Sequence, residues 1–166
     1  MRIPHVVLAL GVIFGAAFAG CQKQASKASA AAPSKPAADF TLQDTSGRQV
    51  TLSEYAGKAN VLIHFGATWC TFCEAQVPAL NALSAKHPSN DFVILSVDSG
   101  EPADKVAGFV SEKKISFLTL VDADGRVANA YGITGIPHNV LVDKSGLIIT
   151  QGTDIPEAEI ANLAGS

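Results

Sequence analysis

The sequence predicts an α/β domain with a mixed central sheet flanked by helices. Strand-like apolar segments alternate with segments of helical periodicity along most of the chain, which is the pattern of parallel strands joined by helices. Near the end, two strand-like segments joined by a Lys-Ser-Gly turn predict a hairpin, which adds antiparallel strands to the sheet.

A second β-hairpin is expected at residues 39–52, before the central strands. Apolar and polar side chains alternate on both sides of the turn at 44–47 (Asp-Thr-Ser-Gly). A short helical turn at 53–57 should follow, because it opens with Ser and Glu and ends with Gly.

The central strands are predicted at residues 60–65 and 91–97. Both segments are apolar at nearly every position, as in strands that are covered on both faces. Between them, residues 70–86 have apolar side chains at helical spacing. The remaining predicted elements are a helix at 102–114, a strand at 117–121, a helix at 126–133, strands at 138–143 and 147–151, and a last helix that starts at Pro156.

Length and charge limit the possible functions. The chain has 166 residues, which suits one globular domain, and a formal net charge of −3. Because its lysines and arginines are scattered and form no basic patch, no nucleic-acid partner is expected.

The first residues predict export from the cell. Residues 6–18 carry no charge and follow a short segment with one arginine, as in a signal peptide. Residues 17–19 (Ala-Phe-Ala) fit ordinary cleavage, whereas residues 18–21 (Phe-Ala-Gly-Cys) resemble a bacterial lipobox, in which Cys21 is lipidated. Lipidation is favoured because it leaves the other two cysteines as a pair.

The predicted organisation is a signal peptide at 1–21, a flexible tether at 22–38 and one domain at 39–166. The tether is rich in Ala, Ser, Lys, Gln and Pro and has no hydrophobic periodicity. The expected location is the cell envelope or periplasm, with a membrane anchor at Cys21 or, after ordinary cleavage, as a soluble periplasmic protein.

Cys70 and Cys73 form a CxxC pair at the start of a predicted helix. Cys70 would lie at the helix N-terminus, where backbone N–H groups and the helix dipole stabilise a thiolate. Cys73, one turn further in, is expected to be less accessible. One thiol can attack a partner's disulfide, and the other can resolve the mixed disulfide. Trp69 is expected either to offer an apolar docking surface beside the pair or to be a partly buried core residue.

A structural or metal-binding role for the pair has less support. A bridge within one helical turn closes a very small loop, so it constrains the unfolded chain little. A zinc site needs four ligands, and His64 and His138 are the only further candidates. A Cu(I)-binding module that uses both thiolates and one histidine stays open as an alternative function.

Three segments of the chain carry a family resemblance. They read ANVLIHFGATWCTFCEAQVPAL, FVILSVD and YGITGIPHNVLVD, and an FTLxDxxG hairpin precedes them. Together they resemble the thioredoxin superfamily, and within it the exported, membrane-tethered TlpA/ResA/DsbE-like branch, which adds such a hairpin. The resemblance implies a thioredoxin-like fold with an N-terminal β-hairpin extension, and a thiol-disulfide oxidoreductase that needs no cofactor and no metal.

The resemblance also implies residue roles and partners. Cys70 would attack and Cys73 would resolve. Ile136-Pro137 would be a cis peptide opposite the pair, where the backbone of residue 136 pairs with an incoming chain. Expected partners are client proteins with disulfides or cysteine pairs, such as apocytochromes (cytochrome c biogenesis) or copper-site proteins, and an upstream thiol-disulfide electron donor.

Three residues depart from the pattern of this branch. His64 stands where relatives have Asp or Asn, and is expected either to exchange a proton with Cys73 or to be a buried core histidine. Gln76 stands where Glu is common, so an acid–base group is lost there. His138, as an imidazolium near Cys70, would stabilise the thiolate and make the pair more oxidising.

Two acidic residues follow the second central strand. Asp98 and Glu101 are expected to belong to a solvated loop and a helix N-cap region.

A peroxidase of the peroxiredoxin type is a third candidate function, because it shares the hairpin and the general fold. It requires a TxxC motif, and Thr68 is one residue too close to Cys70.

Overall fold

The computed structural model describes residues 35–87 and 91–164. The predicted signal peptide, Cys21 and most of the predicted tether lie outside these residues. None of the helices within the two described ranges is long and apolar enough to cross a membrane.

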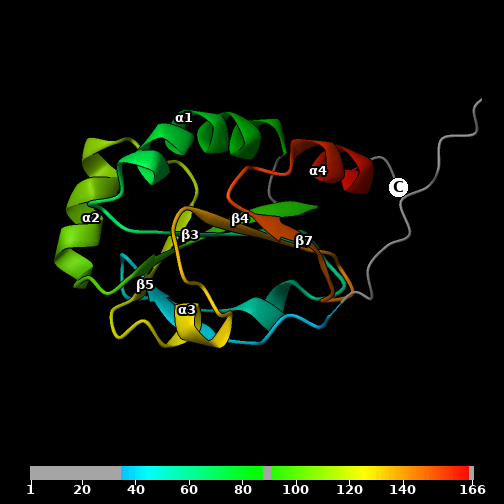
Figure 1. Ribbon diagram of the computed structural model, residues 1–166, viewed down its shortest axis with the longest axis horizontal. Helices are drawn as coiled ribbons and strands as arrows, with labels where there is room; N and C mark the ends of the chain where they lie inside the picture. Colours follow the sequence, from blue (N-terminus) through cyan, green and yellow to red (C-terminus); the bar gives the residue numbers. More distant parts are fainter. Residues whose placement is uncertain (1–34, 88–90, 165–166) are drawn as a thin grey trace, which may run out of the picture. The chain divides into compact units, whose positions relative to one another are not determined.

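The described residues form one mixed sheet of seven strands. The strands are β1 (Thr41–Asp44), β2 (Gln49–Thr51), β3 (Asn60–Gly66), β4 (Phe92–Ser99), β5 (Leu118–Asp122), β6 (His138–Val142) and β7 (Ile148–Gly152). Their order in the sheet is β2-β1-β5-β4-β3-β6-β7 (Figure 1). β4 runs parallel to β3 and β5, and the other neighbours are antiparallel, so the prediction of a mixed sheet is confirmed.

Helices cover both faces of the sheet. The helices are η1 (Leu52–Tyr55, a 3-10 turn), α1 (Thr71–Lys86), α2 (Ala103–Glu112), α3 (Arg126–Ala130) and α4 (Glu157–Ala164). Figure 1 shows α1 and α4 on one face and α3 on the other. Each face has its own apolar cluster, so the sheet lies between two cores.

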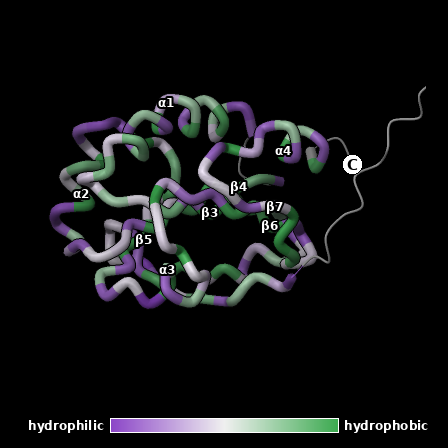
Figure 2. Tube along the Cα trace, in the orientation of Figure 1, coloured by the Kyte–Doolittle hydropathy of each residue, from purple (hydrophilic) through white to green (hydrophobic). Residues whose placement is uncertain are grey.

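β3 shows how the sequence fills both cores. All seven of its residues are buried. Leu62 belongs to the cluster under α1 and α4, whereas Ile63 and Phe65 belong to the cluster on the opposite face, because successive strand residues point to opposite sides. Figure 2 shows the hydrophobic residues along these central strands. A continuous apolar segment is therefore what this central position requires.

Two helices end earlier than the sequence pattern predicts. The helix predicted at 126–133 is α3, which ends at Ala130, because Gly132 has a φ of 69° and a helix cannot continue through this left-handed conformation. The helix predicted at 102–114 is α2, which ends at Glu112, shortly before Lys114 with its φ of 52°.

The last residues of the predicted tether contact the sheet. The N–H of Ala37 donates to the Gly146 carbonyl at 2.9 Å, and the N–H of Ile148 donates to the Lys35 carbonyl at 2.8 Å. The chain is therefore held at the start of β7 before the N-terminal hairpin begins.

Candidate active site

The two predicted redox cysteines form a disulfide where β3 leads into α1. Cys70 is the N-cap residue of α1, and its Sγ lies 2.11 Å from the Sγ of Cys73. The backbone N–H of Cys73 donates to Cys70 Sγ at 3.1 Å. Because this N–H belongs to the free first turn of a 16-residue helix, it stabilises negative charge on Cys70 once the disulfide is reduced.

Both cysteines are almost equally buried in this disulfide. Cys70 is 6% exposed and Cys73 is 5% exposed, so the oxidised state does not distinguish them, and the lower accessibility of Cys73 stays a prediction for the reduced protein. The two bonded cysteines belong to one small cluster with Ala67, and Ile136 packs against this cluster.

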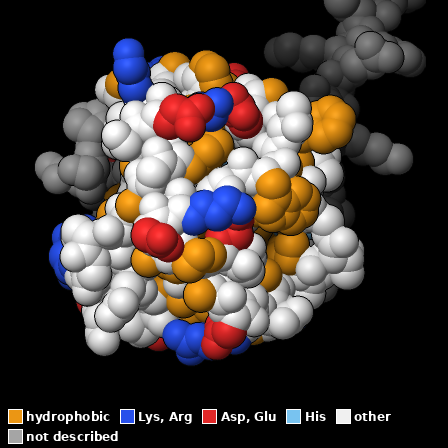
Figure 3. All heavy atoms as spheres, turned by 90° about the vertical axis from the view of Figure 1, so that its left-hand side faces the viewer, with side chains coloured by type: hydrophobic (Ala, Val, Ile, Leu, Met, Phe, Trp, Pro, Cys, Tyr) orange, Lys and Arg blue, Asp and Glu red, His pale blue; other side chains and the backbone are white. Residues whose placement is uncertain are grey.

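Two large apolar side chains beside the disulfide are exposed. Trp69 is 68% exposed and Phe72 is 77% exposed, so Trp69 is not a core residue. Figure 3 shows the end of the molecule at which α1 begins, where hydrophobic side chains gather beside lysine, arginine and acidic side chains. Exposed aromatic rings next to a reactive group are suited to contact with another protein.

The loop before β6 lies against the cysteine pair. The Ile136-Pro137 peptide bond is cis, the conformation that the resemblance implied. Ile136 packs against the cluster of Ala67, Cys70 and Cys73, and Pro137 is buried.

His138 begins β6 and is half-buried, opposite Phe65 in the register of β3 and β6. Within the described residues, no hydrogen bond joins it to Cys70. The structure thus places Ile136 at the disulfide and shows no direct link from His138 to the pair.

His64 is both a buried histidine and a neighbour of the cysteine pair. It is 4% exposed, and its Nδ1 lies 3.0 Å from Oδ1 of Asn139. Burial lowers its pKa below the ordinary value, and the hydrogen bond to Asn139 offsets part of this effect. His64 is therefore neutral at neutral pH.

Gly66 separates His64 from Cys73. A Cβ at residue 66 would lie 3.3 Å from His64 Nε2 and 3.5 Å from Cys73 Sγ. The absence of a side chain at Gly66 thus leaves one small space, which both Nε2 and Sγ border.

Gln76 replaces the expected acidic group with an amide. Its Nε2 donates to the Thr153 carbonyl at 2.8 Å, and its Oε1 accepts from Nδ2 of Asn139 at 3.2 Å. Sequence reasoning missed Asn139, because its place opposite His64 depends on the pairing of β3 with β6.

The prediction of a solvated loop at Asp98 and Glu101 is wrong. Asp98 is 5% exposed and Glu101 is 4% exposed. Glu101 folds back onto the segment before the cysteines, where Oε2 accepts from the Thr68 N–H at 2.6 Å and Oε1 accepts from Thr68 Oγ1 at 2.8 Å. Lys105, four residues later, forms an ion pair with Glu101, and this spacing was the one sequence signal that could have indicated the cluster.

The pKa values of Asp98 and Glu101 are shifted in opposite directions. Burial, together with the adjacent Glu101, raises the pKa of Asp98 from 3.8 to about 8. Burial also opposes ionisation of Glu101, but hydrogen bonds from Lys105 and Thr68 outweigh it and lower the pKa of Glu101. At neutral pH the cluster therefore contains a charged Glu101 and a protonated Asp98.

We expect Thr68→Val to lower the free energy of unfolding by roughly 1.5–3 kcal/mol. Valine keeps the shape of threonine but removes the hydroxyl that donates to the charged Glu101, and hydrogen bonds to charged groups are worth about that much. Chemical denaturation measures the loss. The control is Thr134→Val, which replaces an exposed threonine. Equal stability of the two variants would contradict the role of the Thr68 hydroxyl.

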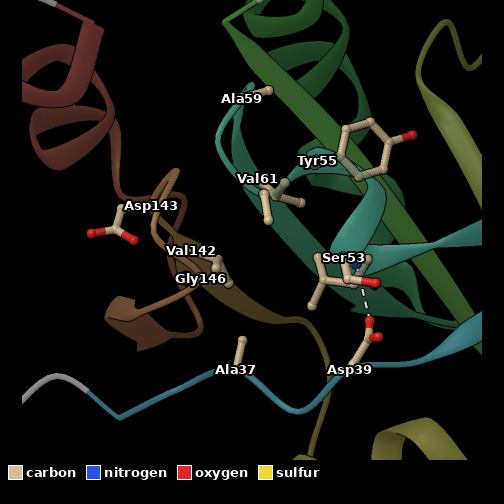
Figure 4. Close-up of a pocket in the computed structure, with 11 residues that line it drawn as sticks. Ala37, Asp39, Ser53, Tyr55, Ala59, Val61, Val142, Asp143 and Gly146 are labelled. Atoms are coloured by element: carbon tan, nitrogen blue, oxygen red, sulfur yellow. Dashed lines mark hydrogen bonds between the residues drawn. The ribbon is translucent and has the colours of Figure 1, made fainter.

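A small apolar pocket lies at the other end of the sheet. Figure 4 shows its lining, which includes Ala59 just before β3, Val61 near the start of β3 and Val142 at the end of β6. The dashed line in the figure is the hydrogen bond from the Ser53 N–H to Asp39 Oδ1, at 3.0 Å. Because the cysteines follow the opposite end of β3, this pocket is not part of the redox site.

Among the residues that the structure describes, no group of three or more His, Cys, Asp or Glu side chains is arranged to hold a metal ion.

Residues 33–151 match the AhpC/TSA family. The chain belongs to this thioredoxin-like family. A relative named thiol-disulfide oxidoreductase ResA, from Geobacillus thermodenitrificans, is 36% identical over 119 residues, which are 72% of this chain and 68% of the relative.

Solved structures of other thiol-disulfide proteins share the fold of this AhpC/TSA family member. The thioredoxin domain of a thiol-disulfide oxidoreductase from Bacteroides vulgatus superimposes with a TM-score of 0.69 at 25% identity, covering 78% of this chain and 96% of that one. An exposed lipoprotein thioredoxin from Streptococcus pneumoniae gives a TM-score of 0.65 at 28% identity, covering 78% and 100%. The thioredoxin-like fold is thus confirmed, and with its CxxC disulfide the protein is a thiol-disulfide oxidoreductase.

Proposed function

We propose that this oxidoreductase reduces disulfides of client proteins in the cell envelope, with Cys70 as the nucleophile and Cys73 as the resolving thiol. This assignment is carried by one observation, the hydrogen bond that the Cys73 N–H donates to Cys70 Sγ at the N-cap of α1. A thiolate is therefore stabilised better on Cys70 than on Cys73, and the thiolate is the attacking species.

The reaction proceeds in two exchanges. Cys70 Sγ attacks one sulfur of the client disulfide, the client S–S bond breaks, and a mixed disulfide remains. Cys73 Sγ then attacks Cys70 Sγ, and the client sulfur leaves with the electron pair and takes up a proton. The client disulfide gains two electrons, which come from the pair of cysteines, and an upstream dithiol protein returns the pair to the reduced state.

Client recognition is assigned to the exposed surface around the pair. Trp69 contributes its large exposed face, and the Ile136-Pro137 segment packs against the cysteines, where its backbone can pair with an extended client chain. We assign His138 the role of stabilising the Cys70 thiolate through space. Its position at the start of β6, one residue after Pro137, supports this role.

His64 is proposed as the proton acceptor for Cys73. Its Nε2 borders the same space as Cys73 Sγ, and a neutral imidazole can accept a proton. His64→Asn is expected to slow the resolving step by roughly 10²-fold or more, the lower end of what general acid–base catalysis contributes. Rapid-mixing measurements of mixed-disulfide decay test this, and an unchanged decay rate would leave His64 a packing residue.

Export and lipidation at Cys21 complete the proposal, supported by the sequence of the first 21 residues and by the similarity to a lipoprotein thioredoxin. Intact-mass analysis of the protein purified from detergent-treated whole cells should give a chain that begins at Cys21 with added acyl groups. A mass that corresponds to an unmodified chain beginning at Gly20 would instead establish a soluble periplasmic form.

The proposed reaction is tested with the purified protein and a disulfide-containing protein substrate. The reduced protein should reduce the substrate faster than a small dithiol does, and an absence of any increase would contradict the proposal. Equilibration with glutathione then gives the direction of electron flow. A potential near that of thioredoxin, about −270 mV, supports a reductant, and one near that of DsbA, about −120 mV, indicates an oxidant.

A further inference from the structure

Asn139 connects His64 to two other elements of the fold. It is fully buried in β6 and stands directly opposite His64 in the register with β3. Its Oδ1 lies 3.0 Å from His64 Nδ1, and its Nδ2 donates to the Thr153 carbonyl at 3.0 Å and to Gln76 Oε1 at 3.2 Å. One side-chain amide thus joins β3, α1 and the residue that follows β7.

The Thr153 carbonyl determines how the Asn139 amide is oriented. A backbone carbonyl only accepts hydrogen bonds, so the Asn139 atom that faces it must be the NH₂ group. Gln76 agrees with this orientation, because its own NH₂ group also donates to Thr153 and its oxygen is left to accept from Asn139. Asn139 Oδ1 therefore faces His64.

This orientation determines the tautomer of His64. Asn139 Oδ1 only accepts, so the 3.0 Å contact is a hydrogen bond only if His64 Nδ1 carries the hydrogen. Burial keeps the imidazole neutral, since it lowers the pKa of His64. A neutral imidazole with its hydrogen on Nδ1 has its lone pair on Nε2, and Nε2 is the atom that borders the space beside Cys73 Sγ.

We propose that Asn139 is a positioning residue, which keeps His64 in the Nδ1–H tautomer so that Nε2 takes the proton of Cys73 in the resolving step. This inference rests on the proposed roles of Cys70, Cys73 and His64. In the step, the Cys73 thiol gives its proton to His64 Nε2, and its sulfur bonds to Cys70 Sγ. The bond from Cys70 to the client sulfur breaks, and the client sulfur leaves as a thiolate that is then protonated. The client sulfur is reduced and the cysteine pair is oxidised.

The tautomer can be observed directly in the wild-type protein. Nitrogen-15 NMR of the full chain, labelled at histidine, distinguishes protonated from unprotonated ring nitrogens, and His64→Asn identifies the signals of His64. The expected result is a neutral ring with the hydrogen on Nδ1. A hydrogen on Nε2 would overturn the proposal, whatever rates the Asn139 variants give.

The kinetic test separates attack from resolution. Reduced protein in a Cys21→Ser background is mixed with the aromatic disulfide dithiobis(nitrobenzoate), which releases one coloured thiolate when Cys70 attacks and a second when Cys73 resolves. Asn139→Leu removes the acceptor and keeps a similar side-chain volume. It should slow the second release at least about tenfold, because a general base contributes roughly 10²–10⁴-fold to the rate of such a step. The first release should be unchanged.

Two further variants exclude a merely structural effect. Asn139→Asp keeps an oxygen that can accept from His64 Nδ1 but loses the NH₂ group that donates to the Thr153 carbonyl, so it should restore part of the second release. Asn60→Leu removes another buried asparagine, whose Oδ1 accepts from the Lys144 N–H at 3.0 Å at the far end of β3, and should leave both releases unchanged.

The outcomes separate a failure of the positioning role of Asn139 from a failure of the proposed roles of Cys70 and Cys73. If the wild-type protein gives no second release, the roles of Cys70 and Cys73 are wrong. If it gives both and Asn139→Leu keeps the wild-type second rate, the positioning role of Asn139 is wrong and the cysteine roles stand. If Asn139→Leu does not fold, the NMR result for the wild-type protein decides.

Discussion

Cys70→Ser is expected to reduce catalysed disulfide exchange to the rate of the uncatalysed reaction. A serine hydroxyl at the N-cap of α1 can still accept the hydrogen bond from the Cys73 N–H, so the helix start should be preserved. It cannot form a mixed disulfide, however, and the N–H that stabilises a thiolate at residue 70 does not serve the remaining thiol of Cys73, because it is the N–H of Cys73 itself and points to residue 70. The loss should therefore be complete without a loss of fold.

Cys73→Ser is expected to give a different result from the same assay. Cys70 still attacks, but no thiol resolves the product, so the protein should accumulate as a mixed disulfide with its client, visible by mass spectrometry. Cys21→Ser is the matched control and should exchange disulfides at the wild-type rate. Full activity of Cys70→Ser, or trapping by Cys70→Ser instead of Cys73→Ser, would reverse the assigned roles.

Asp98→Asn is expected to stabilise the protein at high pH and not at low pH. The pKa of Asp98 is raised from 3.8 to about 8 by burial and by Glu101, so the folded state keeps the proton where the unfolded state has lost it. This stability contribution is fully present below about pH 4 and is lost as the pH rises through about 8. Asparagine has the size of the protonated acid and can donate to Glu101 as that acid does.

The expected gain at pH 9 is at most about 5 kcal/mol, since each unit of pKa change corresponds to about 1.4 kcal/mol and solvent screening reduces the effect. Urea denaturation of the oxidised protein at pH 4 to 9 measures this gain as the difference in the free energy of unfolding between variant and wild type. Asp154→Asn, which replaces an exposed aspartate, is the control and should run parallel to wild type. A difference that does not grow with pH would show that Asp98 is ionised in the folded protein at neutral pH.

Much of this fold could be predicted because its signals are local. The apolar residues of β3 and β4, the helical spacing after Cys73 and the turns of both hairpins each depend on a few consecutive residues. The same is true of the CxxC pair, whose chemistry follows from its place at a helix start. The helix at 126–133 was predicted too long because a pattern of apolar residues does not show that Gly132 adopts a left-handed conformation.

The surroundings of the pair could not be predicted in the same way. Glu101 was predicted to be solvated, yet it is buried because the parallel pairing of β3 and β4 brings it to Thr68. The sequence left Trp69 open between core and surface, and only the packing of the domain decided that it is exposed.

The sequence by itself therefore determined that this protein is a thioredoxin-like domain with a redox pair at Cys70 and Cys73, and that His64 is its unusual residue. Only the tertiary structure decided what His64 can do. Asn139 and Thr153 are distant from it in the chain. The pairing of β3 with β6 brings Asn139 to His64 Nδ1, and the pairing of β6 with β7 brings the Thr153 carbonyl to Asn139. A tautomer depends on which donors and acceptors meet in space, and such contacts across strands leave no local signal in the sequence.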